Sequence, residues 1–267
     1  MSSMTNAVSD GLVITKRNLI KIKRVPDVLV FSTVSPIMFV LLFAYIFGSA
    51  ITVPGVNYRE FLMGGIFVQT VIFGSTWTGA SLAEDLQKGI IDRFRSLPMS
   101  RSAVLVGRTA ADVGNNIVVI VVLALTGLVA GWRIRSSVLE AIAGFLLLLL
   151  FAYAISWVMA VVGLAVRTPE IVNNASFIVI FPLTFMANTF VPIDNFPTVI
   201  KVVAEWNPVS ATTQAVRELF GNTHPAFPPP DVWPLRNPEL YALLWVVVIL
   251  LVFVPLAVRQ YRRAAAR

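Results

Sequence analysis

Residues 141–166 read AIAGFLLLLLFAYAISWVMAVVGLAV, which is 26 consecutive residues without a charged side chain. A helix of this length rises about 39 Å, more than the roughly 30 Å hydrocarbon core of a bilayer. Five further uncharged stretches are long enough to span, so we expect an all-α, polytopic membrane protein with six transmembrane helices. The six expected spans are Val28–Ile51, Phe61–Leu82, Val113–Gly131, Ala141–Val166, Ile171–Val191 and Leu240–Val258.

The composition of the whole chain agrees with lipid as its main solvent. Hydrophobic residues make up 57% of the 267 residues and charged residues 13%, against about 45–50% and about 25% in soluble domains. This balance excludes a soluble enzyme, a disordered regulator and a conventional nucleic-acid-binding domain. Because there is no cysteine, a disulfide scaffold, a cysteine-based zinc site and a cysteine nucleophile are excluded as well.

Catalytic and ATP-binding motifs are missing from the sequence. A single histidine, His224, argues against HExxH and Ser-His-Asp sites. Residues 74–81, GSTWTGAS, have the glycine and serine spacing of a phosphate-binding loop, but Ala80 stands in place of its essential lysine. We therefore predict a chain that is not an enzyme and binds no metal and no cofactor of its own.

The distribution of basic residues predicts the orientation. With the N-terminus inside, fifteen Lys and Arg residues fall in cytoplasmic segments and six in external ones. The positive-inside rule therefore places both termini in the cytoplasm. The formal charge of +7 is explained by this topology without a nucleic-acid partner. Residues 8–25 have an apolar face opposite a basic one, which predicts an interfacial helix or, alternatively, only a basic flank that sets topology.

Residues 83–112, between the second and third spans, are the most charged internal segment. Leu97-Pro98 can stop a helix, and Arg108 with Asp112 predicts an i,i+4 pair at the membrane interface. An amphipathic helix of this kind suits a groove on a cytosolic partner, although a basic loop that only fixes topology is the alternative. The apolar stripe that predicts one helix running out of the membrane consists of Leu82, Leu86, Ile90, Phe94 and Leu97.

The motifs KG at 88–89, DRFRSLPMSR at 92–101 and GR at 107–108 resemble the cytosolic signature of type-2 ATP-binding-cassette (ABC) exporter permeases. The similarity is greatest to the daunorubicin/doxorubicin-resistance permease branch. It extends to Val191-Pro192, Phe196-Pro197, Asn207-Pro208 and Arg217 in the loop before the last span.

This resemblance implies a multi-pass permease subunit in the cytoplasmic (inner) membrane that pairs with a second permease copy or a paralogue. ATP and Mg would be bound by separate cytosolic ABC ATPase subunits, with residues 83–112 as the coupling loop between ATPase and permease. The residues that would transmit force without doing chemistry are Glu84, Lys88, Gly89, Arg93, Phe94, Arg95, Leu97, Pro98 and Arg101.

The external loop, residues 192–239, is expected to hold two short amphipathic helices over 197–206 and 210–220, with Gly221 as the stop of the second. These helices resemble the external re-entrant helical hairpin of the family, which covers the outer exit. The alternative is an interfacial loop that only caps the bundle. The proline-rich stretch that follows predicts an extended connector.

The predicted function is ATP-driven export of hydrophobic or amphipathic compounds (a drug, an antibiotic or a lipid) across the cytoplasmic membrane. Export of a lipid-linked glycan and a non-transporting membrane scaffold are the alternatives. The expected partners are the ATPase, the second permease, membrane lipid and a hydrophobic small molecule. Aromatic and amide side chains of the second and fifth spans are the predicted substrate path, with helix packing as their alternative role: Phe67, Gln69, Phe73, Trp77, Phe185, Met186 and Asn188.

Overall fold

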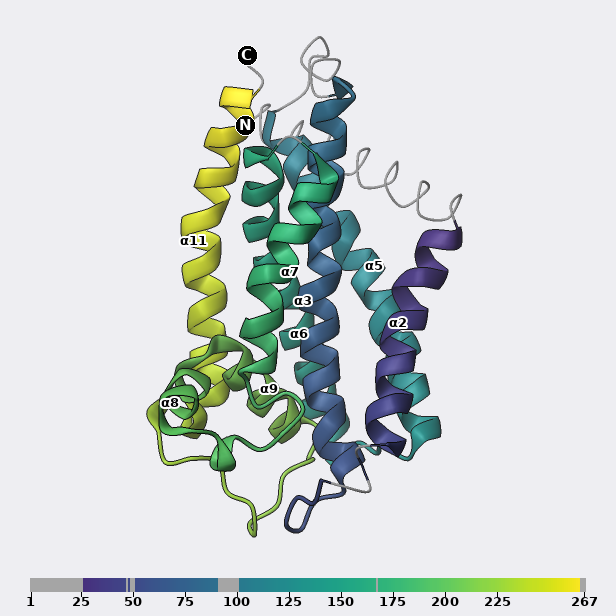
Figure 1. The fold of residues 1–267 in the computed structure, drawn as a ribbon, viewed down its shortest axis with the longest axis vertical. Coiled ribbons are helices and arrows are strands. Elements are labelled where there is room, and N and C mark those ends of the chain that lie inside the picture. The colour runs from purple at the N-terminus through teal and green to yellow at the C-terminus, as the bar shows by residue number, and fades with distance from the viewer. Residues whose placement is uncertain (1–25, 47, 49–50, 91–100, 167, 265–267) are drawn as a thin grey trace.

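The computed structural model describes residues 26–46, 48, 51–90, 101–166 and 168–264, and every named element among them is a helix. Six longer helices run along the long axis of a bundle, and short helices gather at one end of it (Figure 1). The elements are α2 (Pro26–Tyr45), α3 (Tyr58–Gln87), α5 (Arg101–Ala130), α6 (Val138–Ala165), α7 (Pro169–Phe185), η2 (Ile193–Asn195), α8 (Thr198–Trp206), α9 (Pro208–Leu219), α10 (Trp233–Arg236) and α11 (Pro238–Ala264).

Each expected span coincides with a helix, but the helices differ in how fully they meet the requirements for crossing a membrane. Four stretches of the described chain are long and apolar enough by length and composition: Tyr58–Gln87, Leu105–Ala130, Val138–Ala165 and Pro238–Arg263. The first and fifth expected spans hold shorter apolar helices, Thr33–Tyr45 within α2 and Pro169–Phe185. The chain is therefore a helical, multi-pass membrane protein.

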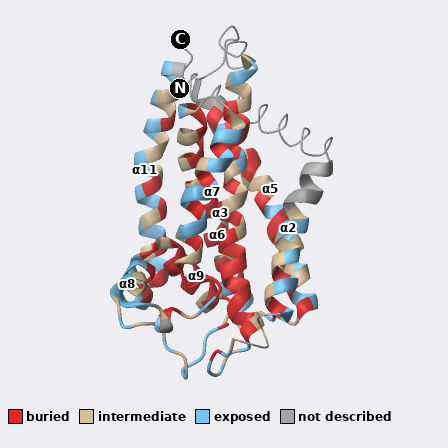
Figure 2. Ribbon diagram, in the orientation of Figure 1, coloured by how far each residue is buried: buried red, intermediate tan, exposed pale blue. Residues whose placement is uncertain are grey.

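The two ends of the bundle differ in character. At one end, here named the Gly89 end, α3 finishes, α5 begins and the last turns of α11 lie (Figure 1). At the other, named the α9 end, lie α8, α9 and the connections from α2 to α3 and from α5 to α6. Buried residues concentrate on α3, α6 and α9, whereas α2 and α11 keep much of their surface exposed (Figure 2).

Helix α3 is the central element, and two of its glycines allow close helix contacts. A Cβ added at Gly163 of α6 would lie 2.2 Å from the Gly79 carbonyl oxygen, and one at Gly65 would lie 1.9 Å from the Thr189 carbonyl oxygen. These backbone-to-backbone approaches leave no room for a side chain. Small residues at helix crossings are typical of membrane bundles, where van der Waals contact replaces the hydrophobic effect.

Local sequence signals set the helix ends at the α9 end. Ser137 and Glu140 form a capping box at the start of α6. The Asn207 side chain accepts a hydrogen bond from the Val209 N–H at 2.9 Å, with Pro208 in the first turn of α9. Gly221 adopts φ +68° just after α9, so the predicted stop of that helix is confirmed.

Helix α5 begins at Arg101, so the expected span that starts at Val113 is the later part of a longer helix. Two expectations about helix length are wrong. Helix α7 ends at Phe185 and not at Val191, because residues 186–190 turn to meet α9. Helix α3 ends at Gln87, so the stripe from Leu82 to Leu97 does not lie on one continuous helix.

Two predicted segments lie outside the described residues. They are the interfacial helix at 8–25 and the centre of the coupling loop, 91–100. In the external loop the two expected helices are confirmed as α8 and α9. The proline-rich stretch is not wholly extended, because it contains the single helical turn of α10.

Candidate functional site

The Gly89 end carries the start of the predicted coupling loop. Helix α3 stops at Gln87, and the Lys88 N–H donates to the Glu84 carbonyl oxygen at 2.9 Å. The Lys88 ammonium also pairs with the Glu84 carboxylate, and this hydrogen bond and charge raise the pKa of Lys88. Gly89 follows with φ +63° and open space around it, a backbone conformation that only glycine adopts at low cost. The chain therefore makes a sharp turn on leaving α3.

The other predicted coupling residues are placed as follows. Arg101 is the first residue of α5, so it flanks the loop on the side opposite Glu84. The remaining predicted coupling residues lie outside the described residues: Arg93, Phe94, Arg95, Leu97 and Pro98.

The predicted pair of Arg108 and Asp112 lies inside the bundle near this end, and its burial was not predicted from the sequence. Asp112 and Arg108 are 4% and 6% exposed, and the Arg108 Nε atom lies 3.8 Å from Asp112 Oδ1. The Thr78 hydroxyl of α3 donates a hydrogen bond to the other oxygen of the Asp112 carboxylate. Both residues precede the expected span, which begins at Val113, but lie within the long apolar stretch Leu105–Ala130 of α5. Buried ionisable groups within membrane helices are costly and are usually retained for function.

The i,i+4 spacing of Arg108 and Asp112 was visible in the sequence, but their burial was not. Leu105, one turn before Arg108, is completely buried in a cluster with Leu82 of α3 and Trp157 of α6. The start of α5 is therefore surrounded by helices on the sides that carry these residues. Through Thr78 and Asp112, the two helices that flank the coupling loop are joined directly.

A row of phenyl rings lines one side of the bundle, from α3 along α7 to α2. Successive ring centroids are 4.1–6.3 Å apart, a spacing typical of attractive aromatic contacts. Phe177 and Phe181 are 55% and 38% exposed, so the row is open to the surroundings of the bundle. This phenyl row consists of Phe73, Phe177, Phe181, Phe185, Phe190, Phe43 and Phe39.

The structure divides the predicted substrate path into two groups. Phe73 and Phe185 belong to the phenyl row, and the nearby Trp77 of α3 is 40% exposed. Met186 follows α7 directly and is partly exposed. Phe177 and Phe181 were not predicted from the sequence, although their four-residue spacing with Phe185 places all three on one helix face.

The other path residues are buried within the bundle. Phe67 is fully buried and packs edge-on against Trp132, Phe145 and Phe220. Gln69 and Asn188 are each 6% exposed. These three predicted path residues thus lie inside the bundle, whereas Phe73, Trp77, Phe185 and Met186 are at least partly exposed.

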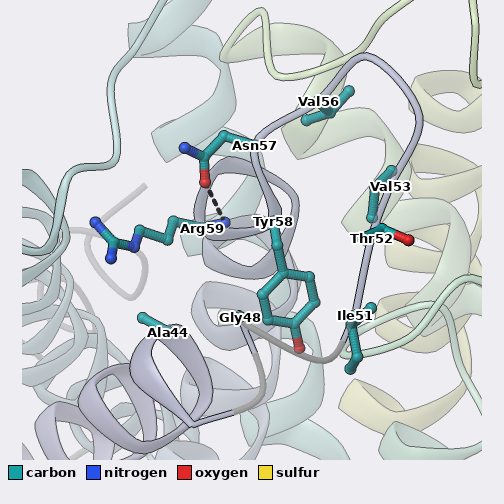
Figure 3. Close-up of a pocket in the computed structure, with 9 residues that line it drawn as sticks. All are labelled: Ala44, Gly48, Ile51, Thr52, Val53, Val56, Asn57, Tyr58 and Arg59. Atoms are coloured by element: carbon teal, nitrogen blue, oxygen red, sulfur yellow. Dashed lines mark hydrogen bonds between the residues drawn. The ribbon is translucent and has the colours of Figure 1, made fainter.

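A cavity of about 440 Å³ lies at the α9 end, between the end of α2 and the start of α3. Figure 3 shows the Tyr58 ring in its wall, with Asn57 accepting a hydrogen bond from the Arg59 N–H at 3.0 Å. The Tyr58 hydroxyl donates to the Phe190 carbonyl oxygen at 3.0 Å. Through this bond the cavity wall contacts the backbone of Phe190, one of the residues of the phenyl row. Its lining residues are Ala44, Gly48, Ile51, Thr52, Val53, Val56, Asn57, Tyr58 and Arg59.

Arg217 joins α9 to the rest of the bundle. Its side chain is 2% exposed, its Nε atom donates to the Phe61 carbonyl oxygen at 2.7 Å, and its Nη2 atom donates to the carbonyl oxygens of Asn188 and Thr189 at 2.7 and 3.1 Å. The guanidinium also lies 3.5 Å from the centroid of the Phe61 ring, a cation–π geometry. Burial lowers the pKa of Arg217 to about 9, which leaves it charged at pH 7.

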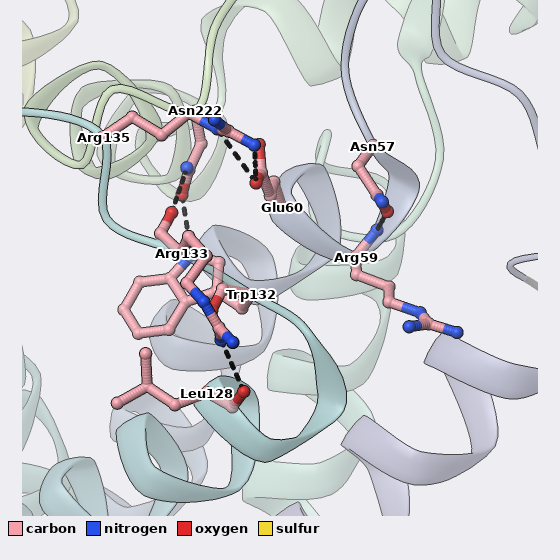
Figure 4. A network of polar contacts seen from close by, with 8 residues as sticks. All are labelled: Asn57, Arg59, Glu60, Leu128, Trp132, Arg133, Arg135 and Asn222. Carbon is pink, nitrogen blue, oxygen red and sulfur yellow. Dashed lines mark hydrogen bonds and ion pairs between the residues drawn. The ribbon is translucent and has the colours of Figure 1, made fainter.

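A second polar network joins the start of α3 to the loop between α5 and α6 (Figure 4). The Arg135 guanidinium makes a forked ion pair with Glu60, with nitrogen–oxygen distances of 2.8–3.0 Å. Trp132 donates its indole N–H to Asn222 just after α9, and Asn222 donates to the Arg133 carbonyl oxygen. With Arg217, this network makes the α9 end a connected assembly of α3, α9 and both adjoining loops.

The chain is similar in sequence to a known family of membrane transporters. The family model for the ABC-2 type transporter matches residues 11–220. The daunorubicin resistance ABC transporter permease protein DrrB1 of Streptomyces coeruleorubidus is 33% identical over 260 residues, which cover 97% of this chain and 88% of the relative.

Two more distant relatives agree with this assignment. A probable doxorubicin resistance ABC transporter permease protein, DrrC of Mycobacterium tuberculosis, is 25% identical over 97% of this chain and 90% of its own length. The putative transport permease ycf38 of Cyanophora paradoxa is 24% identical over 81% of this chain and 76% of its own. The chain therefore belongs to the ABC-2 type transporter family, as an ABC transporter permease similar to those of drug resistance.

Proposed function

We propose that this chain is the membrane subunit of an ATP-driven exporter that moves hydrophobic or amphipathic compounds outward across the cytoplasmic membrane. The observation that carries the proposal is the 33% identity to a daunorubicin resistance permease over nearly the whole chain. In this proposal all six helices cross the membrane, both termini are cytoplasmic and the α9 end is external. The basic segments gathered toward the Gly89 end support that orientation.

The conformational change that ATP drives in the partner ATPase would reach the permease at its Gly89 end. A separate ATPase subunit, which binds ATP and Mg, docks on the coupling loop, and a second permease completes the transporter. The sharp turn at Gly89 sets the direction in which the loop leaves α3. The hydrogen bond from Thr78 to Asp112 then makes α3 and α5 respond together when the loop is displaced.

The phenyl row is the proposed substrate path. Its exposed rings on α7 offer an apolar surface open to the bilayer side of the bundle, so a compound dissolved in lipid can reach it without crossing water. Offset and edge contacts between rings contribute about 0.5–1.5 kcal/mol each beyond the burial of area. Polycyclic aromatic compounds are therefore favoured over straight acyl chains as ligands.

Partnership with an ATPase is tested by co-purifying this chain with the ATPase encoded beside it. Wild type is expected to retain the ATPase, and Phe94→Asp is expected to lose it, because the apolar part of the coupling loop then carries a charge. Thr198→Asp, an exposed position on α8 at the opposite end, is the matched control and should retain it. If wild type retains no ATPase, the chain acts without this partner and the scaffold alternative gains support.

Transport is tested by efflux of daunorubicin from cells that express the permease with its ATPase. Phe181→Ala is expected to reduce efflux several-fold, while Phe181→Trp, which keeps an aromatic surface, should retain most of it. Equal efflux by wild type and Phe181→Ala would remove the phenyl row from the path. Equal drug retention with and without the transporter would instead exclude daunorubicin as a substrate.

A further inference from the structure

Three arginines lie on the outward side of the last turns of α11. Arg259, Arg262 and Arg263 are all exposed, and their spacing of three and four residues places them on one helix face. Among the described residues none of them forms an ion pair. The end of the helix offers them only about half a negative charge through its dipole. Most of the charge of this group, here named the α11 arginine cluster, is therefore not balanced within the described part of the chain.

The opposite side of the same turns fixes the orientation of the cluster. Ala257 and Tyr261 are 0% and 3% exposed, and they belong to a buried group with Trp157 of α6 and Leu105 of α5. A rotation of α11 that turned its arginines inward would remove Tyr261 from this group and bury three charges. The arginines therefore point away from the neighbouring helices.

The face that carries the arginines continues the exposed apolar side of α11. Val248, Val252 and Leu256 precede Arg259 at helical spacing and are 49%, 51% and 37% exposed. Figure 2 shows exposed surface along the length of α11. The membrane-crossing window of this helix is 22% buried, the lowest share of the four long apolar helices. In a multi-pass membrane protein such a face lies against acyl chains, and the arginines follow directly on it.

The length of α11 sets the depth of the cluster. Leu240, which is 53% exposed in the first turn, lies 19 residues before Arg259, and this separation corresponds to a rise of about 29 Å. The hydrocarbon core of a bilayer is about 30 Å thick. With Leu240 at one boundary of this core, Arg259 lies at the other, at the level of the lipid phosphates, and Arg262 and Arg263 follow one turn later.

We propose that the α11 arginine cluster binds the headgroup of an anionic phospholipid in the leaflet at the Gly89 end. A guanidinium can donate two parallel hydrogen bonds to phosphate oxygens. A lipid with a net negative charge, such as phosphatidylglycerol, supplies the missing counter-charge, whereas phosphatidylcholine brings a quaternary ammonium next to the arginines. The inference depends neither on the substrate nor on the ATPase.

The bound lipid has a structural effect on the Gly89 end. It holds the last turns of α11 against the buried group that contains Tyr261, and this group also includes Leu82 of α3 and Leu105 of α5. These two leucines belong to the helices that flank the coupling loop. Anionic lipid therefore stabilises the packing on which the coupling loop is mounted.

Two other occupants fit the cluster less well than lipid. An acidic surface of a cytosolic protein would have to reach a helix face that lies against acyl chains one turn earlier, on the side of α11 away from α5 and α6. A second copy of the chain packed on this face about a two-fold axis would bring the arginines of both copies together, and like charges at an interface are costly. Lipid matches both the apolar and the charged turns of the face.

The affinity of the purified permease for single lipids, measured by native mass spectrometry in detergent, tests the proposal. The titration compares phosphatidylglycerol with phosphatidylcholine of identical acyl chains. Arg259→Gln/Arg262→Gln removes two charges from the cluster. Arg133→Gln/Arg236→Gln removes two charges from exposed positions at the α9 end, so it is the matched control for net charge.

Wild type and the control variant are expected to bind phosphatidylglycerol roughly tenfold or more tightly than phosphatidylcholine. The α11 variant should lose most of this preference and keep its affinity for phosphatidylcholine, because each arginine near an anionic headgroup contributes about 1 kcal/mol, or roughly fivefold. An unchanged preference in the α11 variant would overturn the proposal. An equal loss in both variants would also overturn it, because net charge and not this cluster would then explain the preference.

Two further results would assign the cluster to a different partner. An unchanged lipid preference together with loss of the co-purified ATPase would assign it to a protein contact. An unchanged preference together with a shift from dimer to monomer in the same spectra would assign it to a second copy. Arg262→Gln alone repeats the test if the double variant does not fold, and none of these measurements requires transport activity.

Discussion

The Thr78 hydroxyl on α3 donates a hydrogen bond to the Asp112 carboxylate on α5, which joins the two helices that flank the coupling loop. The carboxyl group is almost completely buried, and the Arg108 Nε atom approaches it only to 3.8 Å. The hydroxyl therefore makes the closer contact with this group.

The first prediction concerns this hydrogen bond. Thr78→Val keeps the shape of the side chain but leaves one carboxylate oxygen without a donor, which costs about 1–3 kcal/mol. Its melting temperature in detergent should fall by several degrees, whereas Thr78→Ser, which keeps the hydroxyl, should lie close to wild type. Equal melting of Thr78→Val and Thr78→Ser would show that the bond contributes nothing to stability.

The second prediction concerns the crossing of α3 and α6. Gly163→Ala places a Cβ atom 2.2 Å from the Gly79 carbonyl oxygen, so the two helices must separate. Gly127→Ala is the matched control, because its nearest neighbour is the flexible end of the Met63 side chain at 2.6 Å. Fluorescence-detected size-exclusion chromatography should show a strong loss of the monodisperse peak for Gly163→Ala only. Comparable peaks for both variants would contradict the close crossing.

The third prediction concerns Arg217. Arg217→Lys keeps the charge, but a single ammonium cannot reach the Phe61, Asn188 and Thr189 carbonyl oxygens in the geometry of the guanidinium fork. We expect a loss of about 1–3 kcal/mol, measured as a lower midpoint of thermal unfolding. Arg236→Lys, an exposed position paired with Asp231, should change the midpoint little. An unchanged midpoint for Arg217→Lys would show that the three bonds are dispensable.

The fourth prediction concerns the middle of α6. Leu148 is completely buried, so Leu148→Arg places a charge without a partner inside the bundle. An arginine at the centre of a membrane helix costs roughly 2.5–3.5 kcal/mol for insertion alone. The amount of protein in the membrane fraction should fall sharply, while Leu148→Met should be tolerated. Normal insertion of Leu148→Arg would refute the assignment of this span.

The sequence predicted the helices well because hydropathy and spacing report directly on a lipid environment. Uncharged length located each long helix, and Gly221 marked the end of α9. The third span was predicted to begin at Val113, because Arg108 and Asp112 were taken as marks of the membrane surface, whereas both are buried within α5. Their burial depends on Thr78, a partner 34 positions away from Asp112, which no local pattern can reveal.

The candidate path was predicted only in part for a similar reason. Phe67 and Phe73 lie on the same helix and have the same side chain, yet one packs into a buried aromatic cluster and the other joins the open phenyl row. Which rings face a neighbouring helix depends on the arrangement of α6, α7 and α9 around α3. Tertiary packing, and not composition, separates the two roles.

The last turn of α7 has a consequence for exchanging segments between related permeases. Backbone groups of this turn and of residues 186–189 after it are paired with α9 and its cap. Asn207 donates to the Leu183 carbonyl oxygen, Ser210 accepts from the Asn188 N–H, and Arg217 donates to the carbonyl oxygens of Asn188 and Thr189. Residues 183–217 are therefore joined into one structural unit. A chimera that takes this whole stretch from a relative should assemble, whereas one with its junction between α7 and α9 combines two halves that were never selected to fit each other.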